Sequence, residues 1–97
     1  MQYMKAIPLA RTKELREDGT IIEVVIWQTA EPLLPCVHPY KYRLYYGNHQ
    51  GCRVRYDNER GKGDHRHVAG REFDYEFTTL EQLLEDFETD IDRWGTE

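Results

Sequence analysis

The chain has 97 residues, which is enough for one domain with a modest core of its own. Hydrophobic residues make up 39% of it, so it is not wholly disordered even though 32% of its residues are charged. No apolar stretch approaches the length of a membrane span and the N-terminus lacks the apolar run of a signal peptide, so we expect a cytoplasmic protein.

Two strands are predicted in the first third of the chain. Residues 5–15 form the first, which contains Pro8 and ends at a turn over residues 16–19. Residues 20–28 form the second and strongest, because β-branched and aromatic side chains fill it. Apart from Glu23 both of its faces are apolar, so we expect one face to be covered by a loop, a second copy or a partner chain. Three prolines indicate a loop at residues 31–39.

Residues 40–46 and 52–57 are predicted to form a hairpin. If Tyr46 faces Cys52, Arg43 lies opposite Arg55, and the two arginines repel unless a carboxylate or a bound anion lies between them. Asp57 would lie opposite Lys41. One face of this hairpin is predicted core, comprising Tyr40, Tyr42, Leu44, Tyr46, Cys52, Val54 and Tyr56. The other is basic, and we expect it to contact RNA or phosphate through Lys41, Arg43, Tyr45, Arg53 and Arg55.

The last third is predicted to hold a charged, glycine-rich loop at residues 58–71, a fifth strand at residues 72–77 and a helix. Thr78 as N-cap with Glu81 three residues later makes a capping box. Helical spacing relates the apolar residues Leu80, Leu83, Leu84, Phe87, Ile91 and Trp94, and Gly95 fits the C-terminal end. The predicted fold is therefore α+β, with a small antiparallel sheet of about five strands packed on one C-terminal helix. We expect a single domain spanning residues 1–97.

Charge is divided unevenly along the sequence. Residues 1–71 hold twelve Lys and Arg against eight Asp and Glu, whereas residues 72–97 hold one Arg against ten acids. Although the net charge of the chain is -5, residues 1–71 are therefore net basic, which points to an anionic partner such as RNA.

The chemistry of the chain is predicted to concentrate between Arg53 and Arg71. His65 and His67 would share one side of an extended backbone, and histidine is the usual acid and base near neutral pH. Lys62 and Arg66 could hold phosphate. With these four as catalytic residues, RNA could be cleaved without a metal, one histidine taking the 2′-hydroxyl proton and the other protonating the leaving oxygen. Further candidates for a base are Glu23 and Asp64.

Other interpretations of the same residues stay open at this stage. The loop could simply be solvated, and it is not a phosphate-binding P-loop because the Gly-x-x-x-x-Gly-Lys-Ser/Thr order is missing. A mixed metal site is conceivable from Cys36, His38, Asp64, His65 and His67. Because these lack a recognisable zinc spacing, we expect no metal and no cofactor. Both cysteines, Cys36 and Cys52, are expected to be reduced and structural.

The chain resembles the TumE family of toxin–antitoxin toxins in segments that follow one another along nearly its whole length. The resemblance is carried by Gly19, Glu23, Ile26-Trp27, His38, Lys41-Tyr42-Arg43-Leu44, Tyr56-Asp57-Asn58-Glu59, Gly61-Lys62-Gly63-Asp64-His65-Arg66-His67, Tyr75, Phe77, Leu83-Leu84 and Asp86-Phe87. It implies a toxin inactivated by an antitoxin encoded next door, typically a helix-turn-helix or similar DNA-binding protein. The loop at residues 32–39 departs from the family's pattern.

These observations predict a toxin that is a metal-independent endoribonuclease with RNA as its target. The alternative is a toxin without catalysis that binds RNA, the ribosome or a protein. A nucleotide-transferring enzyme with carboxylate-held Mg²⁺ ranks last, because no suitable carboxylate pair is found. A homodimer is a further possible assembly.

Overall fold

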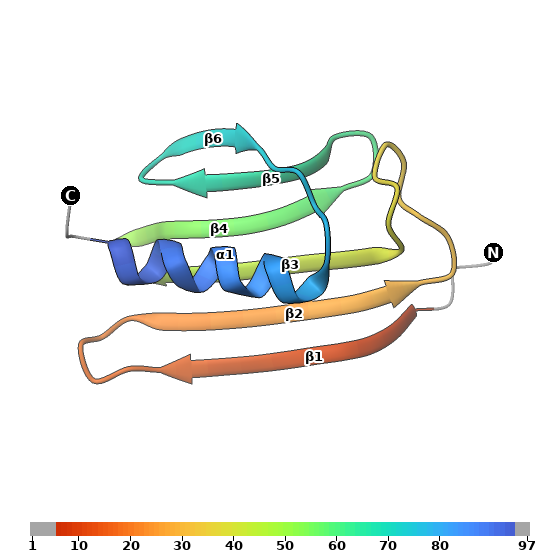
Figure 1. The fold of residues 1–97 in the computed structure, drawn as a ribbon. Helices are drawn as coiled ribbons and strands as arrows, with labels where there is room; N and C mark the ends of the chain where they lie inside the picture. Colours follow the sequence, from red (N-terminus) through yellow and green to blue (C-terminus); the bar gives the residue numbers. More distant parts are fainter. Residues whose placement is uncertain (1–5, 95–97) are drawn as a thin grey trace.

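The computed structural model describes residues 6–94, which form one antiparallel sheet and one helix (Figure 1). The strands lie in the sheet in chain order, so each is hydrogen-bonded to the next. Their bounds are β1 Ala6–Leu15, β2 Ile21–Thr29, β3 Tyr40–Asn48, β4 Gly51–Glu59, β5 Gly63–Val68 and β6 Arg71–Asp74, and the helix α1 spans Leu80–Arg93. The α+β prediction is confirmed, with six strands in place of about five.

The core lies between α1 and the middle of the sheet. The helix runs along β3 and β4 on one face only (Figure 1). Leu83 and Phe87 are its buried apolar residues, and the other four predicted apolar positions of the helix pack partly buried against the same cluster. The sheet contributes the buried residues Ile26, Tyr42, Leu44, Tyr46, Val54 and Tyr56. The predicted core face of the hairpin is therefore confirmed at five of its seven positions, whereas Tyr40 is half-buried and Cys52 is exposed.

The register of the β3–β4 hairpin differs from the prediction by two residues. Tyr46 lies opposite Val54, and a bulge follows between Tyr46 and Gly47. Arg43 is consequently opposite Asp57, so the predicted pairing of two arginines is wrong, as is that of Asp57 with Lys41. A shift of two residues leaves the side chains on the far side of the bulge from the turn on their predicted faces, which explains why Tyr42, Leu44, Tyr46, Val54 and Tyr56 were still predicted correctly as core.

Residues 58–71 are not a loop, and this prediction is wrong. β4 continues to Glu59, a turn leads into β5, and a second turn at Ala69 and Gly70 leads into β6. Gly61 and Gly63 have φ angles of 86° and 85°, in the left-handed region where glycine carries little strain. The two glycines thus belong to a hairpin turn. The residues of β5 have low strand propensity, and they form a strand because they pair with β4 and β6.

The helix begins one residue later than predicted. Thr79, not Thr78, is the N-cap, and its hydroxyl accepts a hydrogen bond from the backbone N–H of Gln82 at 3.0 Å. The third helical residue is therefore Gln82 and not Glu81. Gly95, the predicted C-terminal residue, lies outside the described residues. Within residues 6–94 no helix is long and apolar enough to cross a membrane.

Within residues 6–94 the sheet face opposite α1 carries no helix, and we call it the open face. Residues directly opposite in an antiparallel pair share a face, so the register identifies its members. They include Arg11, Lys13 and Leu15 on β1, Glu23 on β2, Lys41, Arg43 and Tyr45 on β3, Arg55 and Asp57 on β4, His65 and His67 on β5, and Glu72 and Asp74 on β6.

Candidate functional site

The predicted basic face of the β3–β4 hairpin is part of the open face. The guanidinium of Arg43 lies 5.0 Å from the ring centre of Tyr45 and 3.5 Å from a carboxylate oxygen of Glu23. Glu23 is thus a cross-strand partner of an arginine. The ammonium of Lys41 donates to the backbone carbonyl of Asn58, which holds it against the sheet.

A glycine positions the tyrosine of this face. A methyl group at Gly47 would come within 2.6 Å of the Tyr45 hydroxyl oxygen and 2.5 Å of the carbonyl oxygen of Gly51. Only a residue without a side chain allows the Tyr45 ring to lie over this part of β3. Gly47 therefore leaves room for the ring whose face the Arg43 guanidinium contacts.

Arg53, predicted with the basic face, lies elsewhere. Because of the bulge it turns toward the helix side, where its guanidinium is 3.1 Å from the hydroxyl of Tyr46 and 5.4 Å from the ring centre of Trp94. The structure therefore separates Arg53 from the other predicted phosphate ligands.

His65 and His67 lie together on the open face, and β4 brings Arg55 and Asp57 beside them. Arg55 donates from Nε to Asp57 at 3.0 Å and lies with Nη2 2.9 Å from Nε2 of His67. Since an arginine can only donate, Nε2 of His67 accepts and carries a lone pair. A carboxylate oxygen of Glu72 lies 4.0 Å from the same nitrogen.

In the ring of His65, Nε2 is a hydrogen-bond donor and not an acceptor as in His67. Its Nε2 lies 2.8 Å from the backbone carbonyl of Lys62, which can only accept, so this nitrogen carries a proton. Its Nδ1 is buried and lies 3.0 Å from a carboxylate oxygen of Glu72 without the geometry of a hydrogen bond. Glu72 therefore faces both histidines. Lys62 itself is exposed in the β4–β5 turn.

Arg66 and Asp64 point to the other face of the sheet, away from the two histidines. Arg66 binds Asp90 of α1 with both ends of its guanidinium, at 2.7 and 2.9 Å. The hydroxyl of Tyr56 donates to the same carboxylate at 2.5 Å. The hydrogen bonds to Asp90 raise the pKa of Arg66, and burial raises the pKa of Tyr56. Arg66 therefore fastens the helix to β4 and β5.

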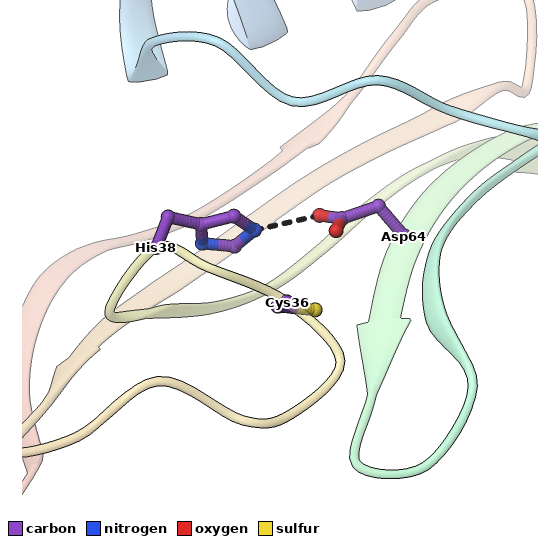
Figure 2. Close-up of side chains that lie close together, drawn as sticks. All are labelled: Cys36, His38 and Asp64. Carbon is purple, nitrogen blue, oxygen red and sulfur yellow. Dashed lines mark hydrogen bonds and ion pairs between the residues drawn. The ribbon is translucent and has the colours of Figure 1, made fainter.

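Asp64 joins a second buried cluster with Cys36 and His38 from the loop before β3 (Figure 2). Their donor atoms all lie within 4.8 Å of one another. Nε2 of His38 is 2.8 Å from Asp64, and the hydroxyl of Tyr42 donates to the same oxygen at 2.6 Å. Burial, with the hydrogen bond to Asp64 and its charge, raises the pKa of the Cys36 thiol to about 11.

The hydrogen bonds of this cluster suit a structural network better than a metal centre. The backbone N–H of Tyr40 donates to Nδ1 of His38 at 3.2 Å, so Nε2 bears the ring proton and donates to Asp64. A metal-bound histidine needs the reverse arrangement, with a lone pair on the coordinating nitrogen and a proton on the other. The raised pKa likewise disfavours a Cys36 thiolate. The cluster holds the loop against β3 and β5.

In a comparison with known families, residues 4–95 match a family described as "Toxin TumE". The chain belongs to the TumE toxin family. The TumE chain therefore has a toxin role, and a cognate antitoxin is its partner. Searches of curated proteins and of solved structures return no significant match.

Two acidic residues of this TumE toxin were missed by the sequence analysis. Asp90 lies seven residues after Leu83 and three after Phe87, so helical periodicity places it on the apolar face, a signal that could have been used. Glu72 gave no such signal. Its place beside the histidines follows from the β5–β6 register, which puts it opposite His67.

Proposed function

We propose that this TumE toxin is a metal-independent endoribonuclease whose substrate binds across the open face. The observation that carries the proposal is the grouping of His65 and His67 with Arg55 on the open face, which no helix of the described part of the chain covers. Arg43, with Tyr45 beneath it, extends the same face across β3 and offers a guanidinium and an aromatic ring to RNA. Its target would be RNA in the cytoplasm of the producing cell.

The two histidines differ in a way that suits complementary roles. A phosphate binding Arg55 would compete for the N–H that now points at His67 and free that lone pair. His67 then takes the proton of the 2′-hydroxyl while the 2′-oxygen attacks phosphorus. His65 gives the proton on its Nε2, which now points at the Lys62 carbonyl, to the departing 5′-oxygen as the phosphorus–oxygen bond breaks. The products are a 2′,3′-cyclic phosphate and a 5′-hydroxyl, and Arg55 stabilises the charge that develops on the phosphate.

The test compares induced expression of wild type and of His65→Ala/His67→Ala in a bacterium, with His49→Ala as the matched control in an exposed turn. We expect arrest and RNA fragmentation from wild type and control, and neither from the double variant. Purified protein should cleave RNA in the presence of EDTA, at a rate that falls by about a hundredfold or more in the double variant. Undiminished toxicity of a well-folded double variant would refute the proposal.

A second function, inhibition by binding RNA, the ribosome or a protein without cleavage, is favoured by the contacts already made in the histidine group. Asp57, Glu72 and Asp74 surround it with carboxylates, whereas Arg43 on β3 lies beside one carboxylate, that of Glu23, at 3.5 Å. In that case Arg43→Glu/Arg55→Glu should abolish arrest and salt-sensitive RNA binding, while His65→Ala/His67→Ala should leave both in place.

A further inference from the structure

The two edges of the sheet differ in how they are protected. β6 is a four-residue edge strand of sequence Arg-Glu-Phe-Asp, and short, charged edges resist pairing with another chain. β1 is a ten-residue edge strand whose side chains are almost all exposed. Among the described residues, six large apolar side chains are exposed, and three of these are on β1: Ile7, Leu9 and Leu15, at 58%, 44% and 72%. β1 is thus the edge suited to strand addition.

Pairing is available along only part of β1. Pro8 and the bulge between Pro8 and Ala10 interrupt the first half, and both features block regular edge pairing. From Ala10 to Leu15 the register with β2 is unbroken. No strand of residues 6–94 pairs with the outer edge of these six residues, which is about 20 Å long.

The charges on this stretch oppose a second copy of the chain. Arg11 and Lys13 are on the open face, and neither has an ion pair or hydrogen bond within the part of the chain that the structure describes. Residues opposite one another in an antiparallel pair share a face. The two symmetric registers that pair most of Ala10–Leu15 would place Arg11 opposite Lys13, or Lys13 opposite Lys13. Either one sets like charges directly against each other.

We propose that an extended segment of the cognate antitoxin adds to the sheet as a seventh strand along Ala10–Leu15. Its side chains on the open face would be acidic opposite Arg11 and Lys13 and apolar near Leu15, which is 72% exposed. Backbone hydrogen bonds supply affinity in this mode of recognition, and alternate side chains supply specificity. The inference depends on membership of the toxin family and not on the ribonuclease proposal.

The test measures binding between the purified toxin and the protein encoded by the neighbouring gene, by calorimetry and by hydrogen–deuterium exchange. Amides of residues 10–15 should exchange more slowly in the complex than in the free toxin, whereas those of β6 should not change. Arg11→Glu/Lys13→Glu should weaken binding about tenfold or more, because two attractions become repulsions. Arg11→Lys/Lys13→Arg should retain it. Arg71→Glu, on the other edge, is the control for a charge reversal.

Three results would overturn the inference. The first is unchanged affinity of the Arg11→Glu/Lys13→Glu variant with residues 10–15 unprotected in the complex. The second is protection of these residues in the free toxin together with a dimer in sedimentation, which would make a second copy the occupant. The third is absence of any complex. Because exchange is read on the wild type, misfolding of a variant cannot obscure the answer, and binding is measured whether or not the toxin cleaves RNA.

Discussion

The ion pair between Arg66 and Asp90 allows a test of whether Arg66 stabilises the fold or takes part in catalysis. Replacing Asp90 by Leu leaves the Arg66 guanidinium without two charge-assisted hydrogen bonds and the buried Tyr56 hydroxyl without its acceptor. Breaking one side of a fully buried ion pair costs about 3–5 kcal/mol. The side chain of Arg66 is 32% exposed, so water recovers part of this, and we expect a loss of about 2–4 kcal/mol in unfolding free energy.

A double-mutant cycle tests this estimate. For a domain of this size the expected loss lowers the melting temperature by roughly 10–25 °C. Arg66→Met/Asp90→Leu removes both charges together, and it should be more stable than the sum of the single changes predicts by about 1 kcal/mol or more. Glu88→Leu, an exposed acid on the same helix, is the control and should change stability by less than about 0.5 kcal/mol.

The functional outcome follows from the same geometry. Arg66 lies on the helix side of the sheet, so the double variant should still arrest growth at temperatures where it is folded. Additive single changes, or a cost of less than about 1 kcal/mol for Asp90→Leu, would contradict the structural role. Loss of toxicity in a folded double variant would instead indicate that Arg66 is a catalytic residue, as the sequence analysis predicted.

Three shorter predictions concern stability. Burial raises the pKa values of the Cys36 thiol and of the buried tyrosines Tyr42 and Tyr56, so the folded state keeps protons that the unfolded state loses at high pH. The unfolding free energy should therefore fall as pH rises above about 9. In urea titrations, Cys36→Ser should reduce this fall between about pH 9 and 10. Thr79→Ala should cost about 1 kcal/mol of unfolding free energy through loss of the N-cap, whereas an equal cost for Thr78→Ala would contradict the assigned cap. Gly47→Ala should lower the unfolding free energy by about 1–3 kcal/mol, because the added methyl group collides with the Tyr45 ring. A change in tyrosine fluorescence would report the displaced ring. An unchanged melting temperature would argue against the close contact.

Much of the fold could be predicted from local patterns. A run of β-branched and aromatic residues identified β2. Alternating apolar residues identified the inner faces of β3 and β4, because side chains in a strand point alternately to its two faces. Helical spacing of Leu83 and Phe87 identified α1 for the equivalent reason. Such patterns also predicted that His65 and His67 share a side.

The remaining features depend on contacts between distant residues. β5 is a strand although its residues are weak strand formers, because β4 and β6 satisfy its backbone hydrogen bonds. The bulge at Gly47 shifted the hairpin register and carried Arg53 away from the basic face. No local pattern distinguishes a solvated acid from Glu72, whose position beside the histidines is set by the β5–β6 pairing.

The sequence by itself determined which side chains share a face of each element, since backbone geometry repeats every two residues in a strand and every 3.6 in a helix. The tertiary structure alone decided which face α1 covers, and so which face is open. That choice assigned His65 and His67 to the open face and Arg66 to the helix. The reason is physical: the register between strands is set by hydrogen bonds and packing across the whole sheet, not by any one segment.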